Sequence, residues 1–137
     1  MKKNKLLYLE EKEFIAKAYY CDKVEEIYSI RSEINRLANT HLFNILEYRK
    51  LIKKVVDLKN KIPIYFSNSL FMFYLRNNEG IYWINYFNIL KICYENEIII
   101  IFQNGDILKL DISKKIIIKE LNKIDMILGY IKNLYQW

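Results

Sequence analysis

The chain has 137 residues, which is long enough for one domain with its own hydrophobic core. Hydrophobic residues make up 53% and charged residues 28%, with one Pro and three Gly, which excludes a disordered tail, a collagen-like chain and a flexible linker protein. Twenty-two Lys and Arg against sixteen Asp and Glu give a formal charge of +6.

The first half of the chain predicts short strands followed by a helix. Three apolar segments, Leu6–Leu9, Phe14–Tyr20 and Val24–Ile30, are separated by charged turns and are predicted strands. Ser32 then stands where a helix can begin. One helix is predicted over roughly 40–57, because apolar residues recur there at spacings of three and four, namely Leu42, Ile45, Tyr48, Ile52 and Val55. Pro63 prevents a helix from continuing beyond Ile62.

The second half predicts an antiparallel sheet over residues 62–112 and a final helix. Strands are expected in Pro63–Phe66, Leu70–Leu75 and Tyr82–Tyr94. Asn104-Gly105 lies between the β-rich runs Ile98–Phe102 and Ile107–Ile112, which predicts a tight two-residue type I′ turn.

Ser113 is a candidate cap for a helix that runs to about Leu134. Its apolar stripe, Ile117, Leu121, Ile124, Leu128, Ile131 and Tyr135, repeats at four, three, four, three and four. We expect Ile117, Leu121, Ile124 and Leu128 of this stripe to pack on the sheet with Trp83 nearby. The whole chain, 1–137, is therefore predicted to be one α+β domain: N-terminal short strands, a central helix, an antiparallel sheet in the form of a meander or partial barrel, and a C-terminal helix.

Cysteines and apolar runs indicate a cytoplasmic protein. Cys21 and Cys93 form no CxxC motif, which is typical of a reduced protein without disulfides. The run Leu6–Leu9 is too short for a signal peptide, and the longest later run, Ile98–Phe102, is too short to span a membrane.

Residue types that support catalysis are sparse. His41 is the only histidine, and Gly80, Gly105 and Gly129 are isolated, so neither a metal-ligand pattern nor a phosphate-binding loop is present in the sequence. The carboxylate pairs Glu10/Glu11 and Glu25/Glu26 are predicted to be solvated. We therefore expect no enzymatic activity, no metal, no cofactor and no small-molecule ligand.

Positive charge gathers in residues 49–61, where six cations and one Asp give a charge of +5. These cations are the candidate DNA-binding residues: Arg49, Lys50, Lys53, Lys54, Lys59 and Lys61. Arg49, Lys50, Lys53 and Lys54 are predicted to share one side of the helix, where their mutual repulsion favours a polyanionic partner. The alternatives are a solvated basic face whose Lys stems cover apolar surface, and a surface for an acidic protein.

Five segments, taken in order, resemble the ComK family, the competence transcription factors of low-GC Gram-positive bacteria. They are Lys61-Ile62-Pro63-Ile64, Leu70-Phe71-Met72-Phe73, Trp83-Ile84, Ile101-Phe102-Gln103-Asn104-Gly105 and Ile112-Ser113. The resemblance covers about residues 60–128, while residues 14–59 are similar only in outline. The chain ends at Trp137, short of the family's longer C-terminal tail.

The resemblance implies a multimeric transcription activator that contacts the minor groove of paired A/T-rich boxes. The alternative is a diverged interaction module that modulates another regulator without activating transcription itself. A homodimer is expected through residues 116–135, since apolar residues also lie off the main stripe, namely Ile116, Ile118, Met126, Ile127 and Tyr130. Alternatively, the N-terminal strands cover this second face within one monomer.

Overall fold

A computed structural model describes residues 4–58 and 60–134, and these form nine strands and three α-helices. The helices are α1 (Ile30–Thr40), α2 (Ile45–Val55) and α3 (Lys114–Leu134). The strands are β1 (Leu6–Lys12), β2 (Ile15–Tyr20), β3 (Val24–Ile27), β4 (Ile64–Ser67), β5 (Leu70–Arg76), β6 (Gly80–Asn85), β7 (Ile89–Tyr94), β8 (Ile98–Phe102) and β9 (Ile107–Leu110). The α+β class predicted from the sequence is confirmed.

The strands form two antiparallel sheets. The large sheet has the order β3-β2-β1-β6-β5-β4, and the small sheet has the order β7-β8-β9. The N-terminal strands thus join the sheet that the sequence placed in residues 62–112. The region Tyr82–Tyr94, predicted as one strand region, is divided by a 3-10 turn, η1 (Tyr86–Asn88), and contributes β6 and β7 to different sheets. The Asn85 side chain caps this turn by accepting a hydrogen bond from the Phe87 N–H at 3.3 Å.

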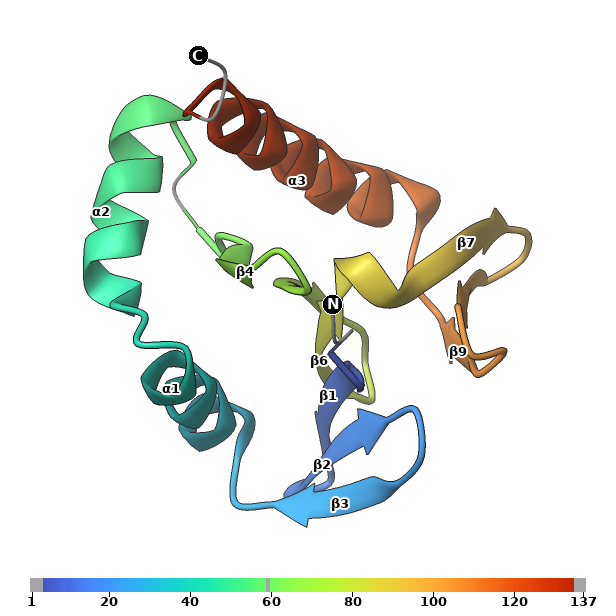
Figure 1. The fold of residues 1–137 in the computed structure, drawn as a ribbon. Coiled ribbons are helices and arrows are strands. Elements are labelled where there is room, and N and C mark those ends of the chain that lie inside the picture. Colours follow the sequence, from blue (N-terminus) through green and yellow to red (C-terminus); the bar gives the residue numbers. More distant parts are fainter. Residues whose placement is uncertain (1–3, 59, 135–137) are drawn as a thin grey trace.

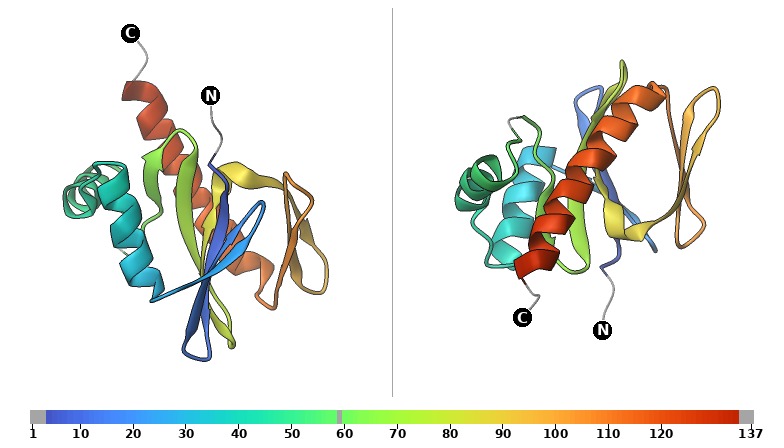
Figure 2. Two further views of the ribbon diagram at one scale, coloured as in Figure 1. Left: turned by 60° about the horizontal axis from the view of Figure 1, so that its bottom comes forward. Right: turned by 90° about the horizontal axis from the view of Figure 1, so that it is seen from above.

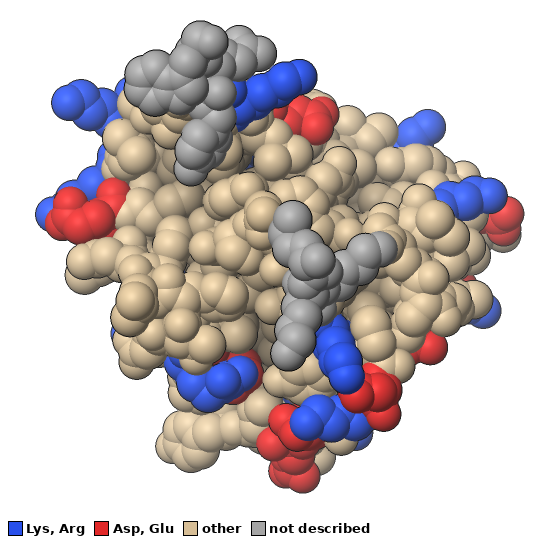
Figure 3. Space-filling view, in the orientation of Figure 1, with Lys and Arg blue, Asp and Glu red and all other residues tan. Residues whose placement is uncertain are grey.

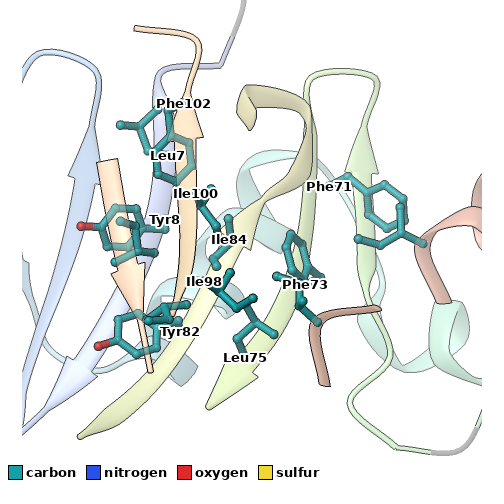
Figure 4. Packing of buried hydrophobic residues seen from close by; sticks show 14 of the residues in the cluster. Leu7, Tyr8, Phe71, Phe73, Leu75, Tyr82, Ile84, Ile98, Ile100 and Phe102 are labelled. Atoms are coloured by element: carbon teal, nitrogen blue, oxygen red, sulfur yellow. The ribbon is translucent and has the colours of Figure 1, made fainter. Parts of the chain in front are cut away.

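The large sheet is covered on both faces (Figures 1 and 2). The helices α1 and α2 lie on one face, and α3 and the small sheet lie on the other. Aromatic and aliphatic side chains of β5, β6 and β8 meet in the core beneath α3 (Figure 4). Ile117, Ile124 and Ile127 of α3 are fully buried in this core. Trp83 belongs to the other core, beneath α1, so the expectation that it lies near the α3 stripe is wrong: neighbouring residues of a strand point to opposite faces.

The helix predicted over 40–57 is α2, which begins at Ile45 and ends at Val55. A separate helix, α1, precedes it, and the strand predicted over Val24–Ile30 ends at Ile27. Ser29 and Ser32 form a reciprocal cap that starts α1. Leu42 was assigned to an apolar helix face. It is instead 96% exposed and left-handed (φ 51°) in the turn between the helices. In this turn the Phe43 N–H donates a hydrogen bond to the Ala38 carbonyl at 2.8 Å, which closes the end of α1. A helix end of this kind usually has Gly at its left-handed position, and because Leu42 occupies it here, the sequence did not reveal where α1 ends.

The β8–β9 hairpin and α3 follow the sequence closely. Ser113 caps α3, and its Oγ accepts a hydrogen bond from the Ile116 N–H at 3.4 Å. The turn itself is one residue longer than predicted. The Phe102 N–H donates to the Asp106 carbonyl at 2.8 Å, which leaves a loop of residues 103–105, and in this loop only Gly105 has a positive φ, of 94°. This arrangement is a type I turn followed by a glycine bulge instead of a type I′ turn, which needs two residues with positive φ.

Candidate nucleic-acid interface

A few buried contacts on one side of α2 hold this helix on the domain. Asn44 caps its first turn by accepting a hydrogen bond from the Glu47 N–H at 3.0 Å. Ile52 is 1% exposed and packs into the core. The Tyr48 hydroxyl donates to the Pro63 carbonyl at 2.7 Å and accepts from the Tyr65 N–H at 3.2 Å. Burial raises the pKa of Tyr48, so the phenol stays neutral and keeps this donor. The rest of the helix surface is open to a partner.

The four predicted cations of α2 are all exposed, and the structure divides them between two surfaces. Arg49 and Lys53 line a hollow beside the sheet together with Lys61. Lys50 and Lys54 line neither this hollow nor the larger one described below. Blue side chains stand along the upper left margin in Figure 3, where Figure 1 places α2 and the end of α3. The remaining predicted cation, Lys59, lies outside the described residues.

Lys61 is brought to α2 by the linker between α2 and β4. It has a left-handed backbone (φ 50°), and its Nζ lies 4.6 Å from the centre of the Tyr74 ring, a cation–π contact. The linker is tied to α3, because Lys123 Nζ donates to the Asn60 carbonyl at 3.1 Å and lies 3.0 Å from a Glu120 carboxylate oxygen. This ion pair is largely buried, which fixes the linker and with it Lys61.

A groove of about 580 Å³ lies between α1, α2 and the face of the large sheet that these two helices cover. We call it the α1–α2 groove: Tyr74, Ile81 and Trp83 of the sheet and residues of α1 and α2 line it, with Arg31, Arg49 and Lys61 as its cations. The smaller hollow, of about 340 Å³, shares Arg49, Lys61 and Trp83 with it.

Sequence reasoning did not find Arg31 and Trp83 as site residues. Arg31 lies in the first turn of α1, a helix whose bounds the apolar spacing did not reveal. Trp83 lies on β6, and its ring is in edge contact with Tyr74 of β5, with 5.7 Å between the ring centroids. No pattern in the sequence connects these two residues, because only the folded sheet brings β6 to the start of α1.

Positive charge in this region is poorly compensated. Among the described residues, Arg31, Arg49, Lys53, Lys54 and Lys61 have no ion-pair partner, whereas Lys50 lies 3.6 Å from Glu47. Glu11 is the one carboxylate that lines the groove, and its Oε1 accepts a hydrogen bond from the Ile30 N–H at 3.0 Å. An uncompensated group of cations on an exposed surface attracts polyanions and acidic ligands.

A family model described as ComK protein matches residues 16–133, which is most of the chain. The chain belongs to the ComK family. No curated protein and no solved structure matches it significantly. The ComK family is a family of transcription factors, so the chain is a regulator of the competence type.

Other polar residues of this ComK family member have structural partners. Glu10, predicted to be solvated, is instead 6% exposed on a central strand, where it accepts a hydrogen bond from the Tyr19 hydroxyl at 3.3 Å. Glu11 caps α1 as described, while Glu25 and Glu26 are exposed as expected. His41 is half-buried against Phe66, with 6.0 Å between ring centroids. Within residues 4–58 and 60–134, no group of His, Cys, Asp and Glu is arranged to hold a metal, and no helix has the length and hydropathy of a membrane span.

Proposed function

We propose that this ComK family member is a cytoplasmic transcription activator that binds A/T-rich duplex DNA through α2 and the linker after it. The proposed contacts are Arg49, Lys50, Lys53, Lys54, Lys59 and Lys61. The observation that carries the proposal is the set of uncompensated cations on α2 and at Lys61, in a chain that matches a transcription factor family.

The cations of α2 divide into phosphate contacts and one minor-groove contact. Exposed Lys side chains on α2 contact phosphates, which gives affinity that is independent of sequence. The narrow minor groove of A-tracts has an enhanced negative potential, which favours insertion of a long cationic side chain such as that of Arg49. Selectivity for A/T-rich sites thus comes from groove shape rather than from a base-by-base code.

The test is a salt series with two labelled duplexes, one A/T-rich and one G/C-rich, followed by fluorescence anisotropy. Five phosphate contacts give a slope of about −4.5 in log affinity against log salt, so affinity falls about 500-fold between 50 and 200 mM salt. The A/T-rich duplex is expected to bind more tightly at every salt concentration. Affinity that does not change with salt contradicts the interface and favours the interaction-module alternative, and equal affinity for the two duplexes contradicts the minor-groove role.

We further propose a homodimer that forms through α3. Ile116, Ile118 and Met126 of α3 are 44%, 38% and 47% exposed, and each offers apolar side-chain surface for such a contact. Ile127, which the sequence assigned to this surface, is instead fully buried in the core, and Tyr130 is half-buried. Paired DNA sites are normally bound by paired subunits.

Light scattering at micromolar concentration measures this assembly directly. The expected mass is twice 16.7 kDa, and changing Ile118 and Met126 to Glu is expected to return it to 16.7 kDa without loss of helix content. A mass near that of one chain, unchanged when duplex DNA is added, contradicts the dimer.

A further inference from the structure

The α1–α2 groove has the dimensions and the lining of a site for a small organic ligand. Its volume of about 580 Å³ lies within the range of such sites and is too small for a duplex. Aliphatic side chains of Ile34, Ile45 and Ile81 line it, and Trp83 adds an aromatic side chain to this lining. A ligand that fills this space therefore needs a compact apolar body.

The polar groups at the groove are mainly donors. Trp83 is 8% exposed and lines the groove, yet within the described chain its indole N–H has no hydrogen-bond partner. This N–H is not fully buried, so it opens onto the groove and can donate a hydrogen bond to an acceptor of a bound ligand. Arg31, Arg49 and Lys61 have no ion-pair partner in the described residues, and the Glu11 carboxylate already accepts a hydrogen bond from the Ile30 N–H.

We propose that the groove binds a nucleoside phosphate. Arg31, Arg49 and Lys61 hold the phosphate, because guanidinium groups bind phosphate oxygens in bidentate geometry and an ammonium group adds a point charge. The base lies against Trp83 and offers a ring nitrogen or carbonyl oxygen to the indole N–H. A flat heterocycle with acceptor atoms meets both requirements, whereas an acyl chain meets only the need for apolar contact.

The α1–α2 groove connects this ligand to DNA binding. Binding of the nucleoside phosphate to the groove does not itself depend on the proposed function. Arg49 and Lys61 belong both to the groove and to the proposed DNA interface. A phosphate bound between them neutralises cations that would otherwise contact DNA. Saturating nucleotide is therefore expected to reduce duplex affinity, while the ligand itself binds in the absence of DNA.

The experiment uses the fluorescence of Trp83. The chain has two Trp residues, so Trp137→Phe leaves Trp83 as the only one. This protein is titrated with AMP, and in separate arms with adenosine, inorganic phosphate and 1-naphthoate. We expect saturable quenching of Trp83 by AMP at one site, and at least about tenfold weaker binding of the other three, because each lacks one part of the recognised ligand.

Two pairs of variants distinguish the groove from general positive charge. Arg49→Gln with Lys61→Gln is expected to weaken AMP about tenfold or more, whereas Lys50→Gln with Lys54→Gln, two exposed cations outside the groove, is expected to change it less than twofold. Circular dichroism confirms that both pairs fold. Three results would each overturn the proposal: no saturable quenching up to millimolar AMP, equal weakening in both pairs, or binding of phosphate or naphthoate as tight as that of AMP. If duplex DNA does not bind, the AMP titrations are unaffected, and only the proposed function is overturned.

Discussion

Reversing the charge of Lys53 and Lys54 to Glu is expected to weaken binding to duplex DNA about 30-fold or more at 0.15 M salt. Both side chains are exposed on α2 and have no ion-pair partner among the described residues. Loss of two phosphate contacts reduces the slope of log affinity against log salt by about 1.8, and two new carboxylates add repulsion. Binding to A/T-rich and G/C-rich duplexes should weaken by similar factors, because phosphate contacts position the protein without recognising sequence.

The matched control reverses Lys114 and Lys115, two exposed cations in the first turn of α3. It changes the net charge by the same amount, so a general effect of charge would weaken binding equally in both variants. We expect the control to retain affinity within a few-fold and to keep the slope of the unmodified chain. Equal losses in the two variants would show that α2 is not the contact surface.

Replacing Asn85 by Leu is expected to lower the free energy of unfolding by about 3 to 5 kcal/mol. Asn85 is fully buried, and its side chain serves four backbone groups at once. Its Oδ1 accepts from the N–H groups of Phe71 at 3.0 Å and Phe87 at 3.3 Å, and its Nδ2 donates to the carbonyls of Leu6 and Ser69 at 3.1 Å each.

The expected loss comes from the groups that remain without a partner. A Leu side chain of similar size fills the space but leaves buried backbone groups unpaired, each at a cost of about 1 to 3 kcal/mol. The Leu6 carbonyl retains a second donor, the Nδ2 of Asn88 at 2.8 Å, which limits the total. Urea denaturation followed by circular dichroism measures the change, and Asn78→Leu in the exposed loop between β5 and β6 is the control. A loss below about 1 kcal/mol would mean that the network relaxes or takes up water.

The sequence predicts local structure well where one signal acts alone. The 4-3-4-3-4 spacing after Ser113 defines α3, and the runs on either side of Asn104-Gly105 define the hairpin, because both patterns depend only on neighbouring residues. The exact turn was missed because a type I turn with a glycine bulge uses the same Asn-Gly pair as a type I′ turn. The break between α1 and α2 was missed because Leu42 occupies a left-handed position that usually carries Gly.

The candidate site was predicted in part. The cations of α2 follow from charge clustering and helical spacing, both of which are local properties of the sequence. The groove was not predicted, because it requires the pairing of β6 with β5 and β1 and the placement of α1 over that face. The sequence gives no indication of which face Trp83 occupies until the register of the strand is known.

The position of β1 has a consequence for the order in which the chain folds during synthesis. β1 is the first strand made and lies in the middle of the large sheet, between its immediate successor β2 and the much later β6. The side chains of Asn85 and Asn88 then join β6 and η1 to the backbone of Leu6 across 79 and 82 positions. A nascent chain that has not yet passed residue 88 therefore exposes an unpaired, apolar strand edge, which invites pairing with other chains. Such long-range closure also makes refolding slow compared with that of a helical protein of equal length.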